Sequence, residues 1–239
     1  MNNKKIPYSR GVWIFGGYFA TRLFVVILSA LCLDRFFKFS KDDLLSVEAY
    51  ADIFGEALAA CVAWTLVKSY YELKTINAEN VSLGLVNVSR IKKMLSVLGG
   101  CILGASIILL RLWFPSRSMG ETSAIEIYTM SGATLRYSWL IAGIVVAPFV
   151  EELLFRGVVF SIITSHLNVY FGAAGSIIFF MLVHLPQIQH DWTSTLAIFA
   201  LGTTCAFIRM KGMSLWMSIL LHGSYNAYLT LWSIIYPYS

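Results

Sequence analysis

Long apolar runs, separated by short polar segments, recur along the whole chain. A helix needs about 20 mostly apolar residues to cross a bilayer, and runs near that length cover residues 11–33, 47–70, 94–114, 138–163, 171–185, 195–208 and 215–236. The fifth and sixth runs are shorter, which is typical of helices that are shielded by neighbours or end in a water-filled cavity. We therefore predict an all-α protein, a polytopic transmembrane helical bundle of seven to eight spans.

The second run departs from this pattern because acidic residues recur in it at four-residue spacing. Glu48, Asp52 and Glu56 would share one face of a helix, because residues four apart lie one above the other. Two placements remain open for this acidic face: the membrane interface, or the wall of an entrance into the bundle.

The composition supports a membrane protein. Mean hydropathy is +0.71 and only 13% of the residues are charged, whereas about a quarter are charged in an average soluble domain. The net charge of +5 could indicate a nucleic-acid partner, but the basic residues lie in short loops beside apolar runs, as the positive-inside bias requires. We therefore expect an integral membrane protein that does not bind nucleic acid.

The distribution of the basic residues predicts an orientation. Ten of them fall on one side of the predicted bundle: Lys4, Lys5, Arg10, Lys68, Lys74, Arg90, Lys92, Lys93, Arg209 and Lys211. Six fall on the other side: Arg35, Lys38, Lys41, Arg111, Arg117 and Arg136. Because cytoplasmic loops carry the excess of Lys and Arg, we expect a cytoplasmic N-terminus and, with seven spans, an external C-terminus. We expect the membrane to be the cell (inner) membrane of a prokaryote.

Two long polar segments, at residues 74–93 and 115–136, divide the chain. We predict N-terminal transmembrane helices and polar connecting loops over residues 1–137, and a catalytic helical core over residues 138–239. The two parts form one integral membrane unit.

Three short polar signatures lie inside the apolar runs of the C-terminal part. They are Glu151-Glu152-x-x-x-Arg156, Phe180-x-x-x-His184 and His222-x-x-x-Asn226. An ionisable side chain in hydrocarbon costs several kcal/mol unless it is paired or faces a wet cavity. Three such groups on successive spans therefore predict one polar chamber between helices.

Helix geometry separates the two adjacent glutamates. Glu152 stands one turn from Arg156 and can form an i,i+4 ion pair, which lowers the cost of burying both charges. Glu151 points about 100 degrees away and has no partner in its own helix. Glu151 is therefore the candidate general base, able to take a proton from a water molecule.

The two histidine signatures offer hydrogen-bond donors to such a reaction. His184, one turn after Phe180, is placed to hold the water or to stabilise an oxyanion. His222 and Asn226 share a helical face, and their ring and amide donors can form an oxyanion hole or orient a peptide bond.

Structural interpretations compete with each signature taken alone. Glu152 with Arg156 can be a clamp, and a single His184 or His222 with Asn226 can be a hydrogen-bonded link between helices; Phe180 is expected to pack. Two histidines and a glutamate also suit catalytic zinc, but no H-E-x-x-H motif is present. We predict no cofactor and no metal ligand, while a divalent metal stays open.

The run from Val150 to Gly157, followed by the two histidine signatures, closely resembles the CPBP (CAAX protease and bacteriocin-processing, Abi) family of intramembrane endopeptidases. The resemblance covers residues 138–228. It implies a glutamic-type protease in which Glu151 and His184 activate water while His222 and Asn226 stabilise the oxyanion. It further implies that Glu152 and Arg156 occupy supporting positions.

The resemblance also implies a membrane-associated protein or peptide as substrate. Family members process prenylated proteins, pheromone or bacteriocin peptides, and C-terminal sorting tails. The three signatures therefore do not identify which of these substrates is cut. Two other functions compete with proteolysis: a hydrophobic-peptide binding or immunity protein, and a transporter that uses Glu151 and His184 as a proton relay.

Overall fold

The computed structural model describes residues 6–36, 41–72, 84–85, 87–114, 133–188 and 191–236. Within these ranges the chain is helical and contains no strand. The elements are α1 (Tyr8–Phe36), α2 (Lys41–Glu72), α3 (Arg90–Trp113), α5 (Ala133–Ile141), η1 (Ala142–Val146), α6 (Ala147–Glu152), η2 (Leu153–Val159), α7 (Phe160–His166), α8 (Val169–Val183), α9 (Leu185–Ile188), α10 (Trp192–Met210) and α11 (Leu215–Ile235). The prediction of an all-α helical bundle is confirmed.

Each of the seven apolar runs falls on a helix, with ends that agree closely with the predicted ones. By length and composition, five described segments can cross a membrane: Tyr8–Ser29, Tyr50–Ser69, Arg90–Trp113, Arg136–His166 and Trp192–Met210. The α8 helix is apolar but shorter, and α11 is long but carries the polar third signature. The protein is therefore an integral membrane protein. Its membrane and its orientation stay predictions.

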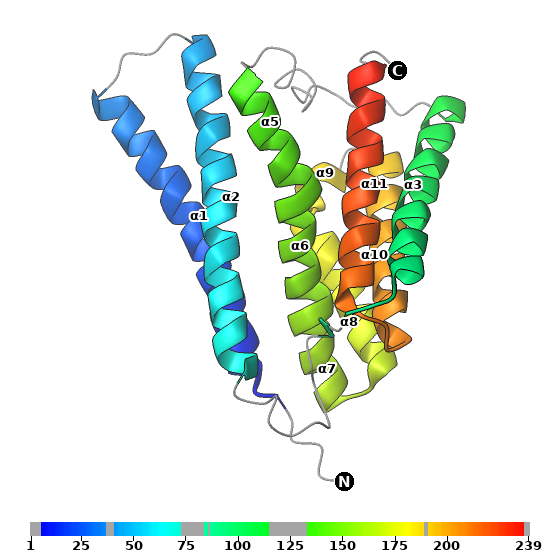
Figure 1. The fold of residues 1–239 in the computed structure, drawn as a ribbon. Helices are drawn as coiled ribbons and strands as arrows, with labels where there is room; N and C mark the ends of the chain where they lie inside the picture. Colours follow the sequence, from blue (N-terminus) through cyan, green and yellow to red (C-terminus); the bar gives the residue numbers. More distant parts are fainter. Residues whose placement is uncertain are drawn as a thin grey trace.

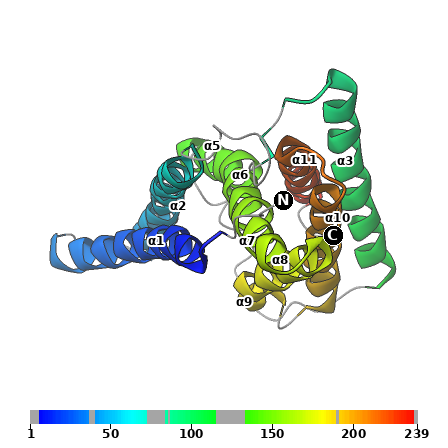
Figure 2. The same cartoon turned by 90° about the horizontal axis from the view of Figure 1, so that it is seen from below.

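The helices form a bundle with one projecting hairpin (Figure 1). Seen from below, α1 and α2 extend to one side, whereas α6, η2, α8, α10 and α11 cluster together and α3 lies along the far side (Figure 2). Packing of α3 against α11 is close, because a Cβ atom on Gly100 would lie 2.2 Å from the carbonyl oxygen of Leu221. The division predicted at residue 137 is untested, and this contact joins its two parts.

The span from Arg136 to His166 is not a uniform α-helix. Two π-helical stretches, η1 and η2, interrupt it on either side of α6, and Pro148 lies in the first turn of α6. Short π-helical insertions widen a helix locally and occur often at functional sites. Here they flank the two adjacent glutamates.

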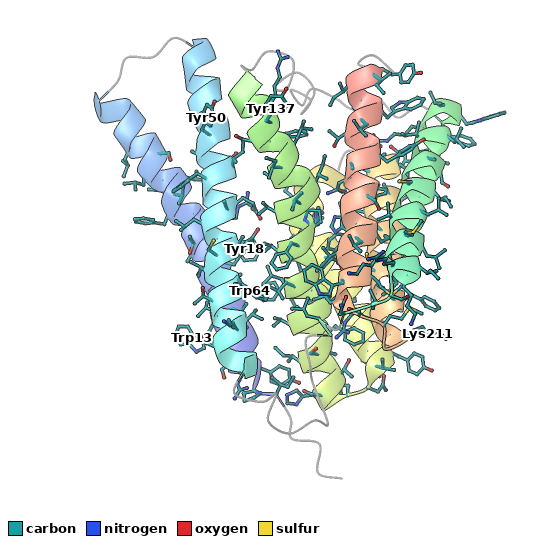
Figure 3. All side chains as sticks on the ribbon, in the orientation of Figure 1. Trp13, Tyr18, Tyr50, Trp64, Tyr137 and Lys211 are labelled. Carbon is teal, nitrogen blue, oxygen red and sulfur yellow. The ribbon has the colours of Figure 1, made fainter. Side chains whose placement is uncertain are left out.

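The acidic face predicted on α2 is partly buried against α1. Glu56 is 9% exposed; its Oε1 accepts a hydrogen bond of 2.6 Å from the Tyr18 hydroxyl, and its Oε2 lies 3.1 Å from Nε of Arg22. Tyr18 lies about midway along the α1–α2 hairpin (Figure 3). Asp52 is exposed, and the side chain of Glu48 lies outside the described residues. The two placements left open by the sequence stay predictions, and Glu56 itself joins the two helices.

Candidate active site

The first signature places a charged pair in the centre of the bundle. Nη1 of Arg156 donates to Oε1 of Glu152 at 3.0 Å, and both side chains are 0% exposed. Nη2 of Arg156 donates to the carbonyl oxygen of Gly202 on α10 at 2.9 Å, and the guanidinium carbon lies 4.3 Å from the centre of the Phe180 ring. The ion pair expected from i,i+4 spacing is therefore present, and it ties η2 to α8 and α10.

His222 on α11 completes the surroundings of Glu152. Its Nδ1 lies 3.0 Å from Oε1 of Glu152. A carboxylate bonded to Arg156 is an acceptor, so Nδ1 of His222 is the donor. The sequence predicted the glutamate–arginine pair but not this third member, because spacing within one helix says nothing about contacts between α6 and α11.

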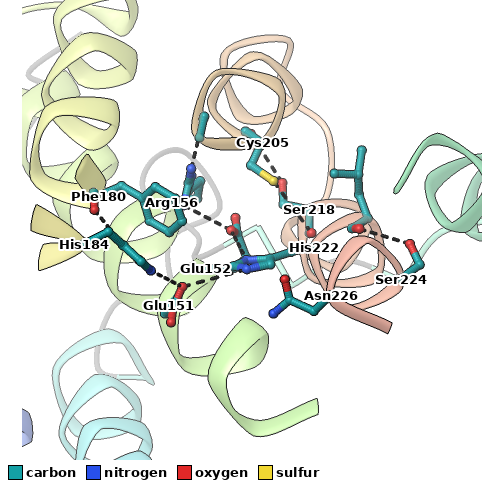
Figure 4. A network of polar contacts seen from close by, with 12 residues as sticks. Glu151, Glu152, Arg156, Phe180, His184, Cys205, Ser218, His222, Ser224 and Asn226 are labelled. Carbon is teal, nitrogen blue, oxygen red and sulfur yellow. Dashed lines mark hydrogen bonds and ion pairs between the residues drawn. The ribbon is translucent and has the colours of Figure 1, made fainter. Parts of the chain in front are cut away.

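Glu151 does not join the charged pair and lies beside two imidazole rings. Its Oε2 lies 3.7 Å from Nε2 of His184 and 3.8 Å from Nε2 of His222. These distances exceed a direct hydrogen bond, and this oxygen has no hydrogen-bond partner among the described residues. The side chain is 22% exposed, so Glu151 is the more accessible of the two glutamates. The three groups converge on one point (Figure 4).

The backbone of α8 fixes the orientation of His184. This residue caps the C-terminal end of α8, and its Nδ1 lies 2.8 Å from the carbonyl oxygen of Phe180. A carbonyl only accepts hydrogen bonds, so Nδ1 carries the proton and Nε2 faces Glu151. The Phe180 ring packs against His184 and His222, with centroid separations of 4.4 and 6.0 Å. Phe180 therefore packs as predicted, and its backbone also orients His184.

Glu151, His184 and His222 bring several hydrogen-bond acceptors close together. When both rings are neutral, the Nε2 atoms of His184 and His222 have lone pairs, and Glu151 contributes a third acceptor. A water molecule can donate two hydrogen bonds to such a group of atoms. The site is therefore built to hold and polarise water, which is the first requirement of hydrolysis.

Asn226 lies one turn from His222 but does not contact Glu151. Its Nδ2 donates to the carbonyl oxygen of Gly143 at 2.9 Å, and Gly143 belongs to the π-helical stretch η1. One of the two amide hydrogens expected to serve an oxyanion is thus bonded to the backbone. Spacing within one helix carried no signal for this contact, because it joins two different spans.

Cys205 was not predicted as part of the site. It is wholly buried on α10, and its Sγ lies 3.9 Å from the carbonyl oxygen of Ser218 on α11. Within the described ranges, no group of three or more His, Cys, Asp or Glu side chains is arranged to hold a metal ion.

Comparison with known proteins concerns the same part of the chain. Residues 133–228 match a family model described as "Type II CAAX prenyl endopeptidase Rce1-like". The matched range contains all three signatures and ends on α11, whereas α1, α2 and α3 lie outside it. No curated protein and no solved structure matches the chain significantly.

The match confirms the resemblance drawn from the signatures. Residues 133–228 are similar to the Rce1-like type II CAAX prenyl endopeptidases. The family that this match names comprises CAAX-type intramembrane proteases, which act on membrane-associated protein substrates.

Proposed function

We propose that the protein is an intramembrane endopeptidase in which Glu151 and His184 activate the hydrolytic water without a metal cofactor. The observation that carries this proposal is the position of Glu151. Oε2 of its carboxylate faces Nε2 of both His184 and His222 and has no hydrogen-bond partner among the described residues. A carboxylate left free beside a buried ion pair is suited to accept a proton from water.

In the first step, water held between Glu151 and His184 attacks the carbonyl carbon of the scissile peptide bond. A carbon–oxygen bond forms, the carbonyl electrons move to its oxygen, and Glu151 takes the proton. The tetrahedral oxyanion then needs donors that are already in place.

His222 can supply one of these donors when its ring is protonated. Its Nδ1–H is held by Glu152, so a second proton, when present, is carried by Nε2, which faces Glu151. The remaining amide hydrogen of Asn226 can supply another donor. Glu152 and Arg156 thus act through His222 as positioning residues rather than touching the substrate.

In the second step, the carbon–nitrogen bond breaks. The proton on Glu151 passes to the leaving nitrogen, and the carbonyl double bond forms again as a carboxylic acid. Glu151 returns to its starting state, which satisfies the requirement that a base in one step serves as an acid in the next.

The experiment that tests the proposal is a comparison of membrane peptides from cells expressing the wild type or Glu151→Gln. We expect one or a few membrane-associated proteins or peptides to accumulate uncut in the variant. The cut peptide then becomes the substrate for purified protein. Identical peptide sets, with equal amounts of both proteins in the membrane, would contradict the proposal.

Metal dependence can be tested on the same purified substrate. We expect cleavage to persist after treatment with a strong divalent-metal chelator. Loss of cleavage that is restored by added zinc would transfer the water-activating role from Glu151 to a metal held by the same side chains.

A further inference from the structure

Three buried hydroxyl groups around the site differ from the other helical hydroxyls of this protein. Many serine and threonine side chains bond to the carbonyl oxygen one turn earlier in their own helix, namely Thr21, Ser29, Thr65, Ser69, Ser96, Ser106 and Thr204. The hydroxyl oxygens of Thr164, Ser176 and Thr203 are buried and bond to no described residue. Buried polar groups are nearly always hydrogen-bonded to protein or to water, so these three call for a partner.

Two of these hydroxyls lie along one face of α8. Gly172, Ser176 and Phe180 are spaced four residues apart and all are buried. Thr164 of α7 lies directly against this face. Its Oγ1 occupies the space beside Gly172, where an added Cβ atom would be only 2.0 Å away. The side chain of Ser176 is one turn further along and is 0% exposed.

The same face leads to the charged pair. Phe180, one turn beyond Ser176, lies beneath the guanidinium of Arg156. Nε of Arg156 and Oε2 of Glu152 are also buried without a hydrogen-bond partner among the described residues. Thr203 lies on α10, which packs against both α8 and η2, one residue after Gly202, whose carbonyl oxygen binds Arg156. The unpartnered atoms therefore belong to neighbouring elements, from α7 and α8 to α10 and the charged pair.

Three of these groups meet α8 at successive turns: Thr164 beside Gly172, Ser176 itself, and Arg156 over Phe180. Four residues of α-helix rise about 6 Å. One water molecule that bonds to two groups spans about 5.5 Å, since each oxygen–oxygen hydrogen bond is about 2.8 Å long. A single water between successive groups thus satisfies each of them, as buried waters in proteins do.

We propose that the hydroxyls of Thr164, Ser176 and Thr203, with Nε of Arg156 and Oε2 of Glu152, bind a file of water molecules that leads along α8 to the catalytic glutamate. Thr164 is two residues from His166, where α7 ends, and α7 lies at one end of the bundle (Figure 1). The file therefore begins near the membrane surface. Hydrolysis consumes one water for each bond cut, and surrounding hydrocarbon does not supply it.

The water-supply role rests on the proposed function, but the water file itself does not. Its test is radiolytic labelling of the full-length protein in lipid nanodiscs in oxygen-18 water, since hydroxyl radicals formed at bound water oxidise adjacent side chains. We expect Phe180, although 1% exposed, to take up label well above Tyr225, which is 5% exposed. Equal low labelling of both rings would overturn the proposal.

Matched variants locate the water. Thr203→Val and Ser176→Ala each remove one group of the file, whereas Thr204→Val makes the same change at the neighbouring position, whose hydroxyl bonds to Ala200. We expect the first two variants, and not the third, to reduce labelling of Phe180. Equal labelling in Thr203→Val and Thr204→Val would contradict the file.

Kinetics then test the supply of water. With an identified substrate, Thr203→Val should lower kcat by about tenfold at unchanged KM, as expected of one lost hydrogen bond along the route, and Thr204→Val should not. If Phe180 is labelled but kcat is the same in both variants, the supply role is wrong. If Glu151→Gln cleaves as fast as wild type, the proposed function fails while the labelling result stands.

Discussion

The described part of the protein contains two intramembrane glutamate–arginine pairs, and they differ in their surroundings. In the core, Glu152 and Arg156 are both 0% exposed and lie one turn apart on the same span. In the hairpin, Glu56 of α2 pairs with Arg22 of α1, with side chains 12% and 41% exposed. The second pair is joined by the Tyr18 hydroxyl, whereas the first is joined by a histidine.

The difference lies in what stands beside each pair. A paired glutamate is a clamp in both places, because its charge is already neutralised. In the core, a second carboxylate, Glu151, faces Nε2 of the histidine whose Nδ1 bonds to Glu152. We infer that catalysis depends on the glutamate without a partner, and that the paired glutamate holds the histidine for it.

The largest effect is expected from breaking the core pair. Arg156→Met leaves the charge of Glu152 buried, which should lower the free energy of unfolding by about 3–5 kcal/mol and abolish cleavage. Adding Glu152→Gln removes that charge and should restore most of the stability but not the activity, because His222 loses its carboxylate. Unfolding in mixed micelles measures the first effect. A double variant as unstable as the single one would argue against an isolated buried charge.

The second-largest effect is expected from replacing His184. His184→Asn keeps an amide donor near the Phe180 carbonyl but removes Nε2, so kcat should fall about 10²- to 10⁴-fold with little change in stability. His166→Asn is the matched control, since His166 bonds to the Ile6 carbonyl outside the site. The measurement is kcat for substrate cleavage by the two purified variants. Similar losses of kcat in both would contradict a role of His184 in water activation.

In the hairpin, Tyr18→Phe removes the 2.6 Å hydrogen bond to Glu56. A hydrogen bond to a charged group contributes about 1.5–3 kcal/mol, so the free energy of unfolding should fall by about 2 kcal/mol while kcat stays within about twofold of wild type. Unfolding curves and initial rates on the same preparation provide both numbers. A large loss of kcat in a stable variant would show that the hairpin takes part in catalysis.

Arg22→Gln should have the smallest effect. Because this side chain is 41% exposed, the ion pair contributes about 1 kcal/mol or less. We expect a small shift in the unfolding transition and an unchanged rate. Destabilisation as large as that of Arg156→Met would mean that the two pairs are equivalent.

The sequence predicted the features that depend on one helix. Apolar length located the spans, and i,i+4 geometry separated Glu152 from Glu151. The bond between His222 and Glu152 joins two spans, and hydropathy carries no information about which spans are neighbours. Likewise, Asn226 of α11 donates to the carbonyl oxygen of Gly143 in the π-helical stretch η1, and no spacing rule predicts a π-helical stretch.

Burial of Glu56 was missed for a related reason. A four-residue acidic repeat predicts a polar face on an isolated helix, but it does not reveal a tyrosine and an arginine on a neighbouring helix that can satisfy one member of the repeat. Asp52 is exposed, as the pattern on an isolated helix implies. Glu56 instead bonds to Tyr18 and Arg22 of the neighbouring helix.

The most direct test of the distinction between the two kinds of glutamate is one rate comparison. Glu151→Gln and Glu56→Gln make the same change at two intramembrane carboxylates, and single-turnover cleavage of the identified substrate in proteoliposomes measures both. We expect Glu151→Gln to lose at least about 10²-fold in rate and Glu56→Gln to stay close to wild type. Equal rates in the two variants would contradict the assignment of Glu151 as the general base.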